Sequence, residues 1–169
     1  MAKKIKILTQ HEVEKKIERL AWEVYERNSR EKSIIIMGIA NRGMILAKAL
    51  SEHVRNISNI NVITGKITLD KDNPYNKDID TNISISECKD KVVLICDDVL
   101  NSGKTLIYAS RYFLQVPIDR LSTVVLVDRN HNKYPIRADY VGLSLATTLK
   151  EYINVVLDGS IGDQGVYIS

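Results

Sequence analysis

The sequence is poor in the residues that form disulfide frameworks and metal centres. Its 169 residues include only two cysteines, Cys88 and Cys96, and three histidines that are far apart in the chain. Neither set has the spacing of zinc ligands, and Cys96 lies in an apolar run where a buried free thiol is common. We therefore interpret both cysteines as free structural thiols. A chain of this length can bury a sufficient core without disulfides or metal.

Long apolar runs and an excess of one charge are also missing. The first residues lead into a polar helical pattern with no signal peptide or membrane span, so we expect a cytoplasmic protein. The formal net charge is only +3, which suits a phosphorylated substrate as well as a nucleic acid. With 44% hydrophobic and 27% charged residues, the composition is typical of a globular protein.

Apolar periodicity predicts alternating helices and strands. Thr9 and Glu12 have the spacing of a capping box, and apolar residues then recur every three or four positions over residues 10–27. Short β-branched runs predict strands at residues 33–39, 61–69, 91–96 and 121–127, separated by helices at 44–54 and 104–115. This order implies an α/β domain with a parallel sheet, whose ligands bind at the carboxyl ends of the strands.

Two segments do not fit the alternation. Residues 70–90 carry many charges with little apolar periodicity, which predicts a long mobile loop of the kind that is often functional. Residues 134–169 contain shorter strand patterns with turns, which predict a small lid or edge subdomain. We expect one domain spanning residues 1–169.

The strongest functional signal lies in residues 91–105. An apolar strand leads to two carboxylates, Asp97 and Asp98, and a short polar loop then opens a helix. The unpaired backbone N–H groups at a helix N-terminus favour a phosphate group. Ser102, Thr105 and the amide of Gly103 add further donors at this place.

Two kinds of ligand match parts of this loop. Gly103-Lys104-Thr105 matches the end of a Walker A motif, but the earlier glycine of that motif would fall at Asp98, which disfavours a nucleoside triphosphatase. A ribose phosphate fits better, because its phosphate would lie on the helix while the carboxylates accept hydrogen bonds from the two ring hydroxyls.

The string from Asp97 to Thr105 resembles the motif of type I phosphoribosyltransferases that binds 5-phosphoribosyl-1-pyrophosphate (PRPP). The whole chain resembles the PyrR family, pyrimidine operon attenuators that are also uracil phosphoribosyltransferases. The likeness is densest over residues 125–131 and 134–142 and also includes Glu26-Arg27-Asn28, Gly38-Ile39 with Arg42-Gly43, Leu46-Ala47-Lys48 and Ile67-Thr68-Leu69. It implies a central, mostly parallel sheet flanked by helices, with a small hood from the chain ends.

The resemblance also implies a PRPP site. Asp97 and Asp98 would hold the ribose, residues 101–105 the 5-phosphate, and Asn41-Arg42-Gly43 the pyrophosphate, in a turn that in this fold often contains a cis peptide. Asp97, Asp98 and Arg42 are the implied catalytic residues. The full implied PRPP set is Asn41, Arg42, Gly43, Asp97, Asp98, Val99, Leu100, Asn101, Ser102, Gly103, Lys104 and Thr105.

Residues 70–90 match the flap that closes over PRPP in related enzymes and excludes water. Lys71 and Lys77 are candidates to meet the pyrophosphate, although the family flap begins with tyrosine and arginine where this chain has Asp70 and Lys71. No metal site made by the protein itself is expected. Mg²⁺ would arrive with PRPP and contact the carboxylate pair through water.

The resemblance places the nucleobase against Asp128, Ile136, Arg137 and Val141. Purine enzymes of this fold carry an aspartate at the position of Asn101, and an asparagine cannot accept the proton of the base. We therefore expect conversion of uracil and PRPP to UMP and pyrophosphate. The alternatives are a purine-base phosphoribosyltransferase and a pyrimidine-responsive RNA-binding attenuator with little catalysis.

RNA is the less favoured partner, because two family features are missing. The family pattern Thr-Arg-x-Ala-His on the first helix is Glu18-Arg19-Leu20-Ala21-Trp22 here, and the lysine after Val-Gly is Leu143. An acidic residue repels RNA phosphates. Trp22 at helical spacing is more often a core or subunit contact, and the family resemblance makes a homo-oligomer the expected state.

Overall fold

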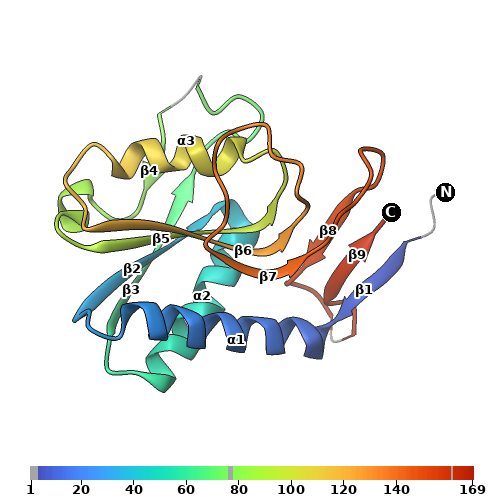
Figure 1. Cartoon of the computed structure of the whole chain (residues 1–169), viewed down its shortest axis with the longest axis horizontal. Coiled ribbons are helices and arrows are strands. Elements are labelled where there is room, and N and C mark those ends of the chain that lie inside the picture. The colour runs from blue at the N-terminus through green and yellow to red at the C-terminus, as the bar shows by residue number, and fades with distance from the viewer. Residues whose placement is uncertain (1–3, 76–77, 161) are drawn as a thin grey trace.

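Two sheets organise the chain (Figure 1). The structure is a computed structural model that describes residues 4–75, 78–160 and 162–169. One sheet has six strands in the order β4-β3-β2-β5-β6-β7, and the other has three in the order β1-β9-β8. No helix among the described residues is both long and apolar enough to cross a membrane.

The six-stranded sheet is mostly parallel, as predicted. Its strands β3, β2, β5, β6 and β7 pair in parallel, and only the short β4 runs antiparallel to β3. The central strands are buried on both faces, which explains their continuous apolar sequence. Its members are β2 (Ser33–Ile39), β3 (Asn61–Thr68), β4 (Asp80–Thr81), β5 (Val92–Leu100), β6 (Arg120–Asp128) and β7 (Tyr140–Ser144).

Helices cover both faces of this sheet (Figure 1). α1 (Gln10–Asn28) and α2 (Ala40–Ile57) share one core with residues such as Ile34 and Leu94, while α3 (Lys104–Phe113) and the 3-10 helix η1 (Ile85–Cys88) share the other with Ile35 and Ile95. The predicted capping box of α1 is present, since the Thr9 side chain accepts from the Glu12 backbone and the Glu12 carboxylate accepts from the Thr9 backbone.

The three-stranded sheet is the expected hood, and both ends of the chain build it. β1 (Ile5–Thr9) and β8 (Ile153–Val156) pair antiparallel with β9 (Gly165–Ile168) between them. β1 was not predicted, because it is stabilised by a partner more than 150 residues away and has no local signal. The predicted lid over residues 134–169 needs a correction as well, since β7 joins the main sheet.

Three predicted boundaries differ from the structure. β5 does not end before the carboxylates but continues to Leu100, because β6 pairs with it along the whole extension. α2 begins at Ala40, so residues 41–43 form its first turn instead of a separate turn before it. Residues 70–90 contain β4 and η1, so the second half of the expected loop is packed against β3 and α3.

Candidate active site

Two buried carboxylates lie at the carboxyl end of β5. Asp97 and Asp98 are 3% and 5% exposed, and a cation approaches each from a different segment. Lys71 Nζ lies 3.0 Å from Asp97 Oδ1 and 3.9 Å from Asp98 Oδ1, and Arg42 Nη1 lies 3.6 Å from Asp98 Oδ2. The structure thus brings the sequence-predicted pair together with Arg42 and Lys71. Lys77 lies outside the described residues.

The environment of Asp97 raises the pKa of its carboxyl group. Burial raises the pKa of Asp97 to about 7, and the negative charge of Asp98 acts in the same direction. The nearby ammonium of Lys71 lowers this pKa but does not cancel the effect of burial. Asp97 therefore exchanges its proton near neutral pH, which is unusual for an aspartate.

A close approach of backbones brings Arg42 to this pair. A Cβ atom on Gly43 would lie 2.6 Å from the carbonyl oxygen of Cys96, so only glycine lets the first turn of α2 rest against β5. The turn begins at Ala40, whose φ of 52° lies in the left-handed region. The described residues contain no cis peptide bond, so the expected cis peptide in this turn is absent.

The phosphate loop lies between β5 and α3. Gly103 has a φ of 85°, and a Cβ atom there would lie 2.6 Å from Ile136 Cγ2, so both conformation and space require glycine. The Ser102 carbonyl accepts hydrogen bonds from the backbone of residues 133 and 134, which holds the loop against the following segment. A cavity of about 180 Å³ follows this loop and is lined by Asp97, Asn101, Ser102, Gly103, Lys104 and Thr105.

A larger cavity of about 510 Å³ adjoins the first and shares Lys71, Asp97, Val99, Asn101 and Thr105 with it. Its remaining walls come from four places: the first turn of α2, Asp98 of β5, the residue just after β6, and the beginning of β8. They include Asn41, Arg42, Asp98, Arg129, Tyr152 and Ile153. The site therefore lies between the carboxyl ends of the parallel strands and the hood.

Arg129 is a site residue that sequence reasoning missed. It is 5% exposed, lines the larger cavity, and donates to side-chain and backbone oxygens of four residues. A charged residue directly after a buried strand was the available signal. Tyr152 and Ile153 were also missed, because their place in the cavity depends on the long-range pairing of the hood.

The four residues expected at the base do not line either cavity. Ile136 packs over the phosphate loop at Gly103, and the Asp128 carboxylate accepts a hydrogen bond from the Asn130 backbone. Val141 lies in β7 and packs against the α3-side core, and Arg137 is exposed. Their contact with a base stays a prediction.

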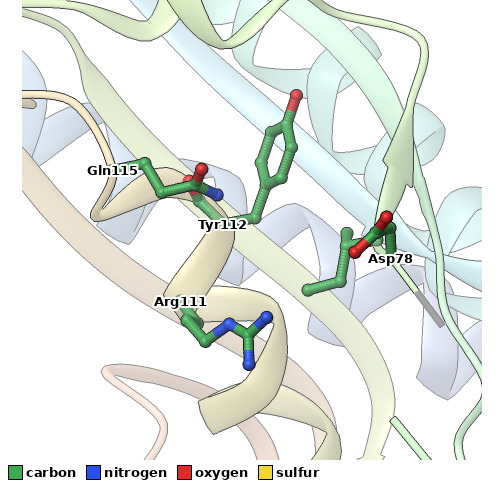
Figure 2. Close-up of a pocket in the computed structure, with 5 residues that line it drawn as sticks. Asp78, Arg111, Tyr112 and Gln115 are labelled. Atoms are coloured by element: carbon green, nitrogen blue, oxygen red, sulfur yellow. The ribbon is translucent and has the colours of Figure 1, made fainter. Parts of the chain in front are cut away.

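Another hollow, of about 410 Å³, lies apart from the carboxylates (Figure 2). Arg111 and Tyr112 of α3 and Gln115, just beyond the helix, line it, and Asp78 lies across from them before β4. It shares no lining residue with the two cavities at β5 and contains neither the acid pair nor the phosphate loop. The candidate active site is therefore the pair of cavities at β5.

Comparison with known proteins decides the family. Residues 5–157 match the family model described as a phosphoribosyl transferase domain. The chain is 34% identical over 172 residues to the bifunctional protein PyrR of Bacillus pumilus, covering 94% of this chain and 93% of the relative. The chain belongs to the PyrR family of phosphoribosyltransferases. The PyrR protein of Pediococcus pentosaceus is 31% identical over 159 residues, 89% of each chain.

Solved phosphoribosyltransferases share the fold. The hypoxanthine phosphoribosyltransferase of Trypanosoma cruzi matches with a TM-score of 0.78 at 18% identity, over 96% of this chain and 94% of that one. A hypoxanthine phosphoribosyltransferase from Staphylococcus aureus matches with a TM-score of 0.70 at 19% identity, over 83% and 77% of the two chains. This family membership makes the chain a PRPP-dependent phosphoribosyltransferase.

Proposed function

We propose that this enzyme transfers the 5-phosphoribosyl group of PRPP to uracil and releases UMP and pyrophosphate. The observation that carries the proposal is that a buried acid pair and a phosphate loop lie together at the end of one strand, β5, where Asp97 and the loop line the same cavity. The relatives at 31–34% identity that bear the name bifunctional protein PyrR support the pyrimidine assignment.

The geometry suggests a place for each part of PRPP. The amides and hydroxyls of residues 102–105 would bind the 5-phosphate, since they open α3. Asp97 and Asp98 would accept hydrogen bonds from the ribose hydroxyls. Asn41 and Arg42, on the first turn of α2, would face the pyrophosphate across the larger cavity. The bond from ribose carbon 1 to pyrophosphate breaks as the bond to uracil N1 forms, and the N1 proton passes to water.

The acid pair also suits Mg²⁺ bound to the substrate. Mg²⁺ prefers oxygen ligands and keeps several waters, and the Lys71 ammonium shows that a cation fits beside both carboxylates. Asp97 and Asp98 would hold the ion through water. When bound, Mg²⁺ neutralises the charge that develops on the departing pyrophosphate. The described residues contain no group of three or more His, Cys, Asp or Glu side chains that could hold a metal ion by themselves.

Asn101 favours a pyrimidine over a purine. It lines both cavities but has no titratable group to accept a proton from the base. The test is pyrophosphate release with PRPP, Mg²⁺ and a panel of bases, with the nucleotide product identified. We expect uracil to give the highest kcat/KM and hypoxanthine and guanine to be poor substrates. A purine base with the higher kcat/KM would overturn the assignment.

The RNA-binding function that the family resemblance implies has less support here. On α1, Glu18 pairs with Lys15 at 2.8 Å, and Arg19 pairs with Glu23, so both cations face carboxylates of the same helix. We therefore propose that specific RNA recognition is weak or lost in this chain. Trp22 is 47% exposed and does not join the core, which leaves it as a candidate contact in the homo-oligomer that we propose.

A further inference from the structure

Arg129 is a buried cation whose hydrogen bonds, within the described residues, all go to neutral oxygens. Its Nε donates to Thr147 Oγ1 at 2.9 Å, and its Nη2 donates to the carbonyl oxygens of Thr148 at 3.2 Å and Glu151 at 2.6 Å. These three bonds fix the guanidinium plane at the carboxyl end of β6. They also hold the segment 147–151, which leads directly to Tyr152 and Ile153 in the wall of the larger cavity.

The fourth bond of Arg129 determines how Asn101 is oriented. Arg129 Nη1 lies 3.3 Å from Asn101 Oδ1. A guanidinium can only donate, so the amide oxygen of Asn101 must face Arg129 and its NH₂ group must point the other way. Asn101 lines both cavities and is exposed, and the described residues give its NH₂ group no other partner. The pair therefore presents a hydrogen-bond donor toward the ligand.

We propose that Arg129 is a positioning residue that turns the Asn101 amide toward the nucleobase, and that the pair selects bases with a carbonyl oxygen at the facing edge over bases with an amino group there. A carbonyl oxygen of the base can accept a hydrogen bond from the Asn101 NH₂ group. An amino group of the base cannot, because both groups are then donors. The inference rests on the proposed function, since it takes the larger cavity as the site of the base.

Binding measurements separate the base from the rest of the ligand. UMP and ribose 5-phosphate differ by the base alone, and CMP replaces one carbonyl oxygen of UMP by an amino group. We would measure all three by calorimetry with the wild-type protein, Arg129→Lys, Asn101→Ala and the double variant. Lysine keeps the charge of Arg129 but cannot reach four acceptors in a planar fork. Arg30→Lys, at an exposed arginine beyond α1, is the matched control.

We expect the wild-type protein to prefer UMP over CMP by about tenfold or more, as for a hydrogen bond that one ligand lacks. Arg129→Lys and Asn101→Ala should each remove most of this preference, and Arg129→Lys should leave ribose 5-phosphate affinity within about twofold. The double variant should lose no more than the single variants, because both act through one donor. Arg30→Lys should behave as wild type.

A merely structural role for Arg129 predicts a different result. Equal losses of UMP and ribose 5-phosphate affinity in Arg129→Lys, additive effects in the double variant, or an unchanged UMP to CMP ratio would each overturn the inference. Failure of the proposed function is distinguishable, because it appears in the wild-type protein as turnover of a base other than uracil. The same four proteins would then be compared on the oxo and amino nucleotides of that base, with the same criteria.

Discussion

At the scale of single residues, Asp97 is buried and lies next to two charged groups, the Asp98 carboxylate and the Lys71 ammonium. Its folded-state pKa of about 7 lies above the ordinary value of 3.8, so between these values the folded protein keeps a proton that the unfolded chain releases. The protonated Asp97 side chain therefore makes its full contribution to the stability of the fold at pH values below 3.8. This contribution is lost as the pH rises through about 7. Lys71 opposes this shift by attraction.

We predict that the free energy of unfolding of the wild-type protein, relative to Asp97→Asn, falls as pH rises from 4 to 7 and then levels off. With Lys71→Met in both proteins, the fall should extend to higher pH, because the charge that lowers the Asp97 pKa is gone. Urea denaturation across this pH range measures both. Lys48→Met, at an exposed lysine of α2, is the control. A flat difference would contradict the assigned environment of Asp97.

Gly103 gives a second prediction at this scale. Gly103→Ala should destabilise the protein by about 1–2 kcal/mol through its positive φ alone, with a further cost from the contact with Ile136. PRPP affinity should also fall, because the phosphate loop must move. Gly162→Ala has a similar cost at a φ of 100° but meets no atom within 4 Å, so it should leave PRPP affinity unchanged. Equal PRPP affinities in the two variants, measured by calorimetry, would argue against this loop as the phosphate site.

At the scale of elements, the sequence was most informative where the signals are local. The capping box at Thr9, the apolar run of β2 and the glycine before α3 each predicted their element, because the signal lies within a few residues. β1 and the contact of Lys71 with Asp97 depend on partners far along the chain, so no local pattern shows them. The role of Arg129 could not be predicted either, because its hydrogen bond to the Glu151 carbonyl depends on the segment that leads into the hood.

The exposed face of α1 carries the prediction about RNA. Arg19 donates to the backbone carbonyls of β7 at 2.9 and 2.8 Å besides pairing with Glu23, so its donors are already engaged. Leu143, in place of the family lysine, packs against the core. We expect only weak, salt-sensitive binding of a pyrimidine-leader hairpin in a gel-shift titration. Nanomolar binding at physiological salt that UMP enhances and a scrambled loop abolishes would restore the regulatory function.

At the scale of the whole molecule, the hood and the main sheet share a core. Val155 of β8 and Val166 of β9 are buried in the same cluster as Leu20 of α1 and Leu50 of α2. We therefore propose that residues 1–169 form one domain, which a single calorimetric unfolding transition would support and two transitions would contradict. This arrangement places the larger cavity between the main sheet and β8 of the hood, so residues from both parts line the site.

The central claim is that the acid pair and the phosphate loop of β5 form the PRPP site. Calorimetry of PRPP with Mg²⁺ against the wild-type protein and Asp97→Asn/Asp98→Asn tests it most directly. Asp158→Asn/Asp163→Asn, at two exposed aspartates near the hood, makes the same change in net charge and is the control.

Each carboxylate accepts a charge-assisted bond of about 2 kcal/mol, so we expect PRPP affinity to fall by roughly a thousandfold in Asp97→Asn/Asp98→Asn and to stay unchanged in the control. Circular dichroism should show the same fold in all three proteins. Undiminished PRPP binding by the folded Asp97→Asn/Asp98→Asn protein would contradict the account.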